Sequence, residues 1–250
     1  MCNSKLTSRS YWENYYIKQH TDKSHIVNVC SYYDRFWDTF FSGDSKTKSL
    51  IEIGGFPGRY LAYLASKYGV KPTCLDYNSD KAQIEESFLT MNVDDYDIIQ
   101  EDFINFKTNK KYDFVLSNGF VEHFENYDQI LDLHLSYLKN NGKLLVMIPN
   151  MKGYIKLYKT LVDKANLDIH NLECMSLQVF HDFAKRHNLK TEYVSYFGGF
   201  PYNVHQSLNI FQKIIFKTHH FIFKRFFNKK LELKPSKYFS SGIIAIFEKP

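Results

Sequence analysis

The stretch Leu50-Ile51-Glu52-Ile53-Gly54-Gly55-Phe56-Pro57-Gly58-Arg59 decides how this chain folds. Its apolar residues predict a strand over Ser49–Ile53, and the pattern after it predicts a helix over Arg59–Tyr68. The closely spaced glycines between them permit a tight turn and let a ligand lie against the backbone. A strand, a tight turn and a helix start bring backbone amides close to a small ligand. We therefore expect a ligand site at this turn.

The glycine spacing argues against a dinucleotide as this ligand. A dinucleotide loop follows G-x-G-x-x-G, and its second glycine lets the pyrophosphate approach the backbone. When the pattern starts at Gly54, Phe56 and Arg59 occupy the second and third glycine positions. Glu52 would also repel a pyrophosphate, whereas it would suit a cationic or amine-bearing ligand. A nicotinamide oxidoreductase is therefore the least favoured function.

Length and composition describe one ordinary globular domain. The 250 residues suffice for one substantial core with a small decoration, and 44% hydrophobic with 24% charged residues is typical of that class. We see no signal peptide and no apolar run long enough to span a bilayer. Cys2, Cys30, Cys74 and Cys174 lie far apart without metal-ligand spacing. We expect reduced thiols in a cytoplasmic protein.

Strand and helix patterns alternate along the chain. After the first strand, we predict strands over residues 73–76, 97–100, 113–117, 143–148, 191–196 and 242–248. We predict helices over Asp80–Thr90, Tyr127–Leu138 and Ser176–His187, with one or two more before the first strand. The turn Lys139-Asn140-Asn141-Gly142 should end the second of these, with Gly142 as its left-handed cap. The alternation predicts an α/β fold, a doubly wound and mostly parallel seven-stranded sheet whose last strand inserts antiparallel.

The first motif resembles that of class I S-adenosylmethionine-dependent methyltransferases of the small-molecule type, commonly E-x-G-x-G-x-G. Glu52, Gly54 and Gly58 match this motif, while Phe56 stands where the family usually has its middle glycine. S-adenosylmethionine has no pyrophosphate, so one missing close-approach glycine matters less here than in a dehydrogenase. The resemblance covers roughly residues 49–150. It implies a Rossmann-like methyltransferase fold, S-adenosylmethionine as cofactor, and loop contacts that include Gly55.

The ends of the second and third strands carry acids that match further family positions. Asp76 lies 24 residues after Glu52, where an acid can accept both ribose hydroxyls, and Tyr77 follows it. Asp102 matches the family's adenine-contacting acid, and Phe103 would flank the base. By the resemblance these four residues bind the cofactor. A surface acid that caps the next turn remains the alternative for Asp76.

The fourth strand leads into a second motif of the resemblance. It ends at Ser117 and Asn118 and runs into Val121-Glu122-His123, similar to the family's L-E-H stretch. Ligands of open α/β sheets sit beyond the carboxyl ends of the strands, so we expect Ser117 and Asn118 to border the cofactor. The N/D-P-P-Y/F pattern of enzymes that methylate exocyclic amines of bases is absent.

Two histidines are candidates for the general base. Methyl transfer from a sulfonium is one displacement, and a hydroxyl or ammonium acceptor must also lose a proton, usually to histidine near neutral pH. His123 follows the fourth strand, and His170 lies where related enzymes often carry a lid histidine. Packing or capping is the alternative for His123, and an exposed loop position is the alternative for His170. Asn150 and Tyr202 are candidates for acceptor contacts.

We predict no metal site. His219 and His220 are adjacent, so they point to different sides of a helix, and no carboxylate three or four residues away completes a ligand set. Packed or solvated side chains are the expected outcome.

A late segment carries the basic excess of the chain. The net charge is +5, yet eight Lys or Arg lie between Lys213 and Lys237 against Glu232 alone, a local +7. Within residues 210–230, five apolar residues share one helical face: Phe211, Ile214, Ile215, Ile222 and Phe226. Peripheral membrane contact and packing on the domain itself or on a second copy both fit such a helix. Nucleic acid is disfavoured, because no recognisable binding module accompanies the segment.

We interpret residues 1–250 as one methyltransferase domain. Its parts are a helical cap (1–48), a cofactor-binding core (49–150), a lid or substrate segment (151–189), a basic aromatic insertion (198–238) and a final strand (239–250). The expected function is methylation of an O or N atom of a small molecule, with a sugar or surface-glycan precursor as the preferred acceptor. A non-catalytic S-adenosylmethionine-binding protein and an RNA methyltransferase remain the alternatives.

Overall fold

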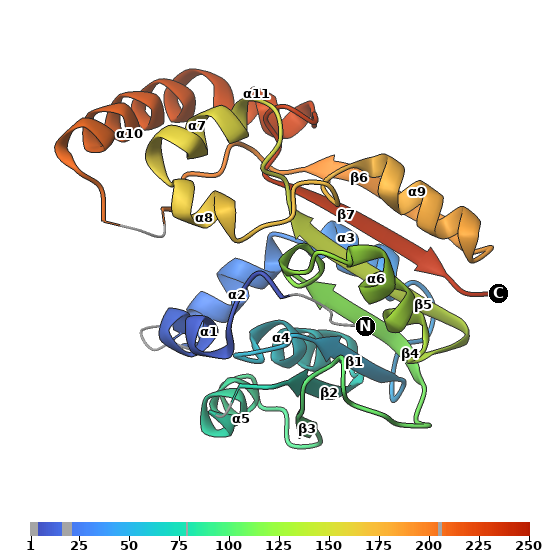
Figure 1. The fold of residues 1–250 in the computed structure, drawn as a ribbon. Helices are drawn as coiled ribbons and strands as arrows, with labels where there is room; N and C mark the ends of the chain where they lie inside the picture. The colour runs from blue at the N-terminus through green and yellow to red at the C-terminus, as the bar shows by residue number, and fades with distance from the viewer. Residues whose placement is uncertain (1–4, 17–21, 79, 205–206) are drawn as a thin grey trace.

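The computed structural model describes residues 5–16, 22–78, 80–204 and 207–250, and these form one sheet flanked by helices (Figure 1). Its order is β3-β2-β1-β4-β5-β7-β6, and β7 alone runs antiparallel to its neighbours. The strands are β1 (Ser49–Ile53), β2 (Lys71–Asp76), β3 (Asp97–Gln100), β4 (Tyr112–Asn118), β5 (Leu138–Pro149), β6 (Lys190–Phe197) and β7 (Gly242–Glu248). The predicted doubly wound, mostly parallel sheet is confirmed.

Helices cover both faces of this sheet (Figure 1). Before β5 they are α1 (Arg9–Tyr16), α2 (Lys23–Ser31), α3 (Asp34–Phe40), α4 (Arg59–Tyr68), α5 (Lys81–Thr90), the 3₁₀ turn η1 (Val121–His123) and α6 (Tyr127–Leu135). After β5 they are α7 (Tyr154–Val162), α8 (Lys164–Asp168), α9 (Leu177–Arg186), α10 (Ile210–Ile222), the π-helix η2 (Phe223–Phe227) and α11 (Asn228–Leu233). Three helices, rather than one or two, precede β1 in the described residues.

The two faces hold separate cores because successive side chains of a strand point to opposite sides. In β1, Leu50 joins the core under α2 to α5, whereas Ile51 and Ile53 join the core under α6, α7 and α9. All of these side chains are fully buried. The near-continuous apolar run of β1 is what a parallel strand covered on both faces requires.

The turn predicted over residues 139–142, after the helix that is now α6, is wrong in its details. The helix ends at Leu135, and residues from Leu138 onward already pair with β4. Asn141, and not Gly142, adopts the left-handed backbone (φ 58°). Gly142 is small for another reason, since a Cβ there would lie 2.9 Å from the carbonyl oxygen of Asp113. Gly142 therefore marks a position where two strands approach each other closely, and not a helix cap. A lone glycine can indicate either.

The basic aromatic insertion (residues 198–238) packs on α7 through aromatic rings. His219 stacks on Phe223 with ring centroids 4.0 Å apart and lies 4.4 Å from the ring of Tyr158. The Asn228 side chain accepts a hydrogen bond of 2.7 Å from the amide of Phe200, which joins the end of the insertion to the loop after β6. Together α7, α8, α10 and α11 gather beyond the end of β5 (Figure 1).

Two expectations from the sequence concern membrane-spanning helices and the state of the cysteines. None of the helices in the described ranges combines the length and apolar character needed to cross a bilayer. Cys30, Cys74 and Cys174 are free and buried, while Cys2 lies outside the described residues.

Candidate functional site

The loop between β1 and α4 needs glycine at two positions. Gly54 has φ +69°, and a Cβ there would lie 2.5 Å from the ring of Phe120. Gly58 has φ +87° and stands before the first residue of α4. L side chains are strained in this backbone region, and at Gly54 the ring leaves no room besides. The loop therefore lies directly against the segment that follows β4.

Asp76 holds this loop to the end of β2. Its carboxylate accepts hydrogen bonds from the amides of Phe56 (3.1 Å) and Asn78 (2.8 Å). Burial raises the pKa of Asp76, and the two amides oppose this shift. The same carboxylate lines the adjoining pocket. Asp76 thus shapes the loop and presents an acceptor to a ligand.

A pocket opens at the carboxyl ends of β1, β2, β3 and β4, and we call it the first pocket. The space between its walls, open solvent at the mouth included, is about 670 Å³. Eight of the residues that we predicted from sequence line it: Gly54, Phe56, Asp76, Tyr77, Asp102, Phe103, Asn118 and His123. The topology brings these positions from four separate strand ends to one place, as expected for an open parallel sheet.

Other predicted residues of the cofactor set lie behind the pocket wall. Glu52 points to the α4 side of the sheet, in register with Cys74 and Leu116, and is 2% exposed. Burial raises the pKa of Glu52 well above its usual range, although the nearby Arg59 opposes the shift. Ser117 is fully buried as well. Among the described residues, Glu52, Gly55, Gly58 and Ser117 support the loop and do not line the pocket.

The N-terminal segment closes one side of the pocket, which the sequence did not reveal. The amide of Leu6 donates to the carbonyl of His123 (2.8 Å), and the Lys5 ammonium pairs with Asp102. The ring of Trp12 lies 4.8 Å from that of His123, and Tyr16 lies 5.0 Å from Phe56. Trp12 and Tyr16 are four residues apart on one face of α1, a spacing that could have indicated a buried face.

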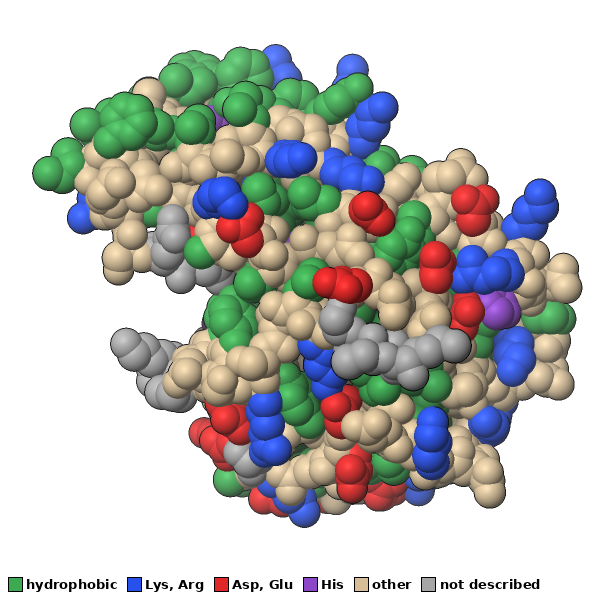
Figure 2. Space-filling model, viewed as in Figure 1, with side chains coloured by type: hydrophobic (Ala, Val, Ile, Leu, Met, Phe, Trp, Pro, Cys, Tyr) green, Lys and Arg blue, Asp and Glu red, His purple; other side chains and the backbone are tan. Residues whose placement is uncertain are grey.

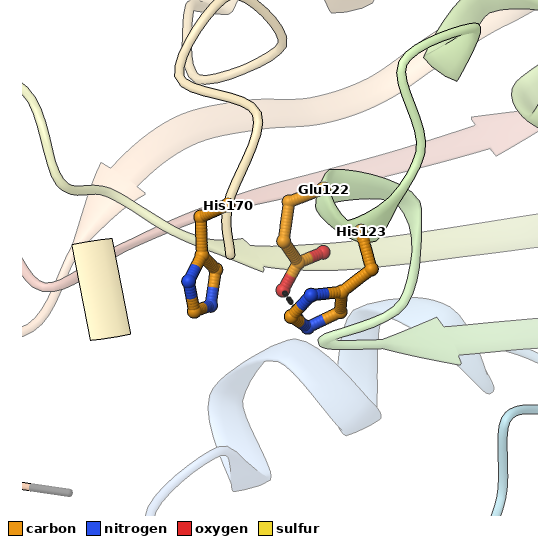
Figure 3. A group of neighbouring side chains, drawn as sticks. All are labelled: Glu122, His123 and His170. Carbon is orange, nitrogen blue, oxygen red and sulfur yellow. Dashed lines mark ion pairs between the residues drawn. The ribbon is translucent and has the colours of Figure 1, made fainter. Parts of the chain in front are cut away.

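Figure 3 shows Glu122, His123 and His170 grouped together, and His123 of this group lines the first pocket. His123 Nε2 lies 3.8 Å from Glu122 Oε1, and the ring centroids of the two histidines are 4.6 Å apart. The amide of Asn171 donates to the carbonyl of Glu122 (2.7 Å) and so fastens the segment after β5 to η1. The structure therefore brings both predicted histidines together and adds Glu122, which we did not select from sequence.

Burial sets the protonation of this group. It lowers the pKa of His123 to about 3, with His170 adding to the effect, and raises the pKa of Glu122 to about 8. His123 is therefore neutral at physiological pH, with one ring nitrogen, Nδ1, 3.0 Å from the carbonyl of Ile169. A neutral imidazole at a pocket wall has a nitrogen that can accept a proton, but the burial that lowers its pKa also makes it a weaker base.

Glu122, His123 and His170 are all residue types that can bind a metal ion, and one ligand atom from each lies within 4.8 Å of the others. His123 Nε2 and Glu122 Oε1 are 3.8 Å apart, which is wider than the roughly 3.3 Å between two ligand atoms on one zinc ion.

A second pocket adjoins the first. It encloses about 730 Å³ with its open mouth, and it is lined by the ends of β4 to β7 together with Lys159 and Asn203. Asn118 lines both pockets. The Lys159 ammonium, buried in α7, pairs with Asp163 (2.9 Å) and donates to the carbonyl of Asn203 (2.6 Å). The two spaces therefore have a residue at the end of β4 in common.

The two predicted acceptor residues differ in placement. Asn150 lines the second pocket, and its amide nitrogen donates to the carbonyls of Ser240 (2.9 Å) and Lys237 (3.2 Å). Tyr202 lines neither pocket, and its ring lies 4.4 Å from that of His220 on α10. His219 and His220 are thus both engaged in ring packing.

Comparisons with known proteins agree with this geometry. Residues 25–194 match the family model described as a methyltransferase domain. No curated protein matches the sequence. A structure of a candidate sarcosine dimethylglycine methyltransferase from Galdieria sulphuraria is similar, with a TM-score of 0.62, 14% identity, and coverage of 96% of this chain and 97% of that one.

Two further structures extend the comparison. The N-methyltransferase NodS from Bradyrhizobium japonicum WM9, in complex with S-adenosyl-L-homocysteine, gives a TM-score of 0.53 at 12% identity and covers 98% and 95% of the two chains. The cyclopropane synthase MmaA2 from Mycobacterium tuberculosis gives 0.59 at 13% identity, with 94% and 88% covered. These likenesses establish the fold, and the family model spans most of the chain. The chain belongs to the methyltransferase-domain family and is a class I S-adenosylmethionine-dependent methyltransferase.

Proposed function

We propose that this enzyme methylates an O or N atom of a small molecule that is bound where the two pockets meet. The observation that carries the proposal is the shared wall at Asn118. One pocket carries acids at two neighbouring strand ends, and the other carries polar groups from β5 and α7. A donor and an acceptor held on either side of one residue are positioned for direct transfer.

The residues of the first pocket fit S-adenosylmethionine. Asp76 can accept from the ribose hydroxyls, while Asp102 and Phe103 stand at the next strand end, where the adenine would lie. Phe56 lines the pocket, and its ring lies 5.0 Å from that of Tyr16 in an edge-to-face arrangement. When bound, the cofactor supplies an electrophilic methyl group on a sulfonium.

We assign His123 the removal of the acceptor's proton. Its imidazole is neutral across the physiological range and lies on the wall of the first pocket. Glu122 Oε1 stands 3.8 Å from Nε2, and its carboxyl group, protonated below about pH 8, would balance the charge that His123 gains only by releasing its own proton. His170 lies against His123 and is the second candidate for the same role.

A sugar or surface-glycan precursor is the acceptor class we favour, in a cytoplasmic reaction. The second pocket supports this choice, because its lining includes the amide side chains of Asn118 and Asn203, which suit hydroxyl-rich ligands. Related structures include N-methyltransferases, such as NodS, so an amine acceptor is kept in the same test.

The test is a turnover assay with labelled S-adenosylmethionine across nucleotide-linked sugars, lipid-linked sugars and small amines. We expect turnover with one of the sugar classes, and a loss of about 10²- to 10⁴-fold in kcat for His123→Asn. His170→Asn, measured in parallel, identifies which histidine is needed. Calorimetric titration with S-adenosylhomocysteine serves as the control, since both variants should keep the affinity of the unaltered chain.

Three results would count against parts of this proposal. Turnover with amines alone would remove the sugar acceptor. Cofactor binding without turnover on any acceptor would favour a non-catalytic binding protein. Full activity in both histidine variants would remove the assigned base.

A further inference from the structure

The helices beyond β5 expose an unusual amount of apolar surface. Of the fourteen exposed large hydrophobic side chains in the described residues, ten lie on α7, α10, η2 and α11. We name as the outer apolar surface the side chains of Leu157, Leu161, Phe211, Ile214, Phe221 and Phe226. Figure 2 shows hydrophobic side chains gathered over this end of the molecule. Surfaces of this kind mark interaction sites.

Helix α10 has two apolar faces with different surroundings. Its inner face, with Ile215 and His219, packs on the core and on the rings of α7, and Phe223 of η2 adjoins this face. Its outer face carries Phe211 and Phe221, each 68% exposed. The single apolar face predicted from the sequence is therefore wrong, because Ile215 is packed while Phe211 and Ile214 are exposed, and the outer face has no partner among the described residues.

Lysine and arginine side chains border the outer face of α10, and they have no acidic partners among the described residues. Lys213, Lys217 and Lys224 recur along one flank at helical spacing, and Arg225 lies within the face itself. None of these four forms an ion pair within the described ranges, although lysines elsewhere, such as Lys71 and Lys110, pair with carboxylates. This segment therefore carries an uncompensated positive charge.

A shallow hollow on this surface gathers the same cations. It is lined by Lys217, His220, Phe221, Lys224 and Arg225, with an open volume of about 840 Å³. Three cations around an apolar ring suit a phosphate group whose neighbouring atoms are apolar.

We propose that the outer apolar surface docks on the face of an anionic lipid bilayer. An amphipathic helix in this setting buries its apolar side chains at the boundary between headgroups and acyl chains, with its cations at the anionic phosphates. A second copy of the chain fits less well. A two-fold interface would bring this surface, from a segment of net +7, against itself.

The docked orientation would also serve the acceptor pocket. Helix α7 carries Leu157 and Leu161 outward and Lys159 into the second pocket. A lipid-linked acceptor could thus reach that pocket from the bilayer. This last step rests on the proposed function, whereas membrane docking itself does not.

The experiment is sedimentation of the full chain with vesicles of phosphatidylcholine, alone or with added phosphatidylglycerol. We expect binding only to the anionic vesicles, weakened by salt. The variant Lys217→Glu, Lys224→Glu, Arg225→Glu should lose about 100-fold in partitioning, at about 1 kcal/mol for each cation near the surface. Phe211→Ser with Phe221→Ser should lose at least tenfold, since two apolar rings no longer enter the bilayer.

A matched charge control is Lys46→Glu, Lys107→Glu, Lys185→Glu, which changes three exposed lysines on other elements and should bind as the unaltered chain does. Cofactor titration shows that every variant is folded, and it separates failure of docking from failure of methyl transfer. Equal binding to neutral vesicles, equal loss in the control variant, or no vesicle binding would overturn the proposal. So would a dimer, seen by light scattering, that Phe211→Ser with Phe221→Ser dissociates.

Discussion

The region around the first pocket, which we call the cofactor half, and the basic aromatic insertion (residues 198–238) contain similar residue types. The cofactor half turns them inward, whereas the insertion turns many of them outward. Around the first pocket, Trp12, Phe56 and Phe103 turn inward, and Lys5 is paired with Asp102. On the outer apolar surface, Phe211 and Phe221 turn outward, and the neighbouring cations have no acidic partner in the described part of the chain. Composition alone does not distinguish these two regions. The difference lies in whether other segments of the same chain cover the aromatic face.

The two regions also differ in where they keep their ionisable groups. The cofactor half buries Glu52 and Glu122, whose pKa values burial raises. The insertion exposes its charges to solvent. Burying a carboxyl group in this way costs stability, which proteins commonly tolerate where a perturbed group has a function. The region around the first pocket therefore holds buried carboxyl groups with raised pKa values, whereas the insertion holds its charges at the surface.

The largest effect on stability should come from Gly54→Ala, which changes the loop of the cofactor half where its backbone lies against the ring of Phe120. The new methyl group would meet the ring of Phe120 in a left-handed backbone, at a cost of about 2–5 kcal/mol of unfolding free energy. Gly43→Ala is the matched control. It has φ +94° with no atom within 4 Å, so only the backbone cost of about 1–2 kcal/mol applies. Denaturant unfolding measures both, and equal losses would contradict the close approach.

The next effect is a pH dependence of stability in Glu122→Gln. The folded pKa of about 8 exceeds the ordinary value of 4.5, so the folded state keeps a proton that the unfolded chain releases. The stability of the unaltered protein should therefore fall, relative to the variant, as pH rises from 4.5 to 8, and stay level above 8. The relative change should be on the order of a few kcal/mol.

Unfolding curves of the unaltered protein and Glu122→Gln at several pH values measure this difference. Glu173→Gln changes an exposed carboxyl group on the segment after β5 and is the control. Parallel pH profiles for the unaltered protein and Glu122→Gln would show that Glu122 ionises normally in the folded state.

The smallest effect concerns Asp76→Ala and the cofactor alone. The variant loses the acceptor for the amides of Phe56 and Asn78 and the group offered to the ribose. Charged hydrogen bonds contribute about 1.5–3 kcal/mol, so we expect roughly 10- to 100-fold weaker binding of S-adenosylmethionine in calorimetric titration. Asp97→Ala, at the exposed start of β3, should leave the affinity unchanged. An unaltered affinity in Asp76→Ala would remove this residue from the site.

The sequence predicted the sheet well because its information is local. Apolar runs in β1 and β4 and the glycine loop fix strand, turn and helix within a few residues of one another. Asp76 at the end of β2 was found because topology places the carboxyl ends of the parallel strands on one edge, whereas Asp102 after β3 was found through the resemblance to the methyltransferase family. The end of α6 was misplaced because Gly142 marks a strand contact that no local pattern reveals.

The site was predicted only in part, because several of its contacts join distant segments. His123 and His170 meet because Asn171 fastens the chain after β5 to η1. Trp12 and Tyr16 cover one side of the first pocket through contacts between distant residues. Trp12 contacts His123, more than a hundred residues away, and Tyr16 contacts Phe56, forty residues away.

The sequence by itself determined the fold class, the glycine loop and the acids of the first pocket, because each depends on residues close together or on strand topology. The tertiary structure alone decided that Glu52 is covered, that Glu122 joins the two histidines, and that one face of α10 is packed while the other is exposed. These outcomes depend on which distant segments lie against a residue, since burial sets both the pKa of a group and the use of an apolar side chain.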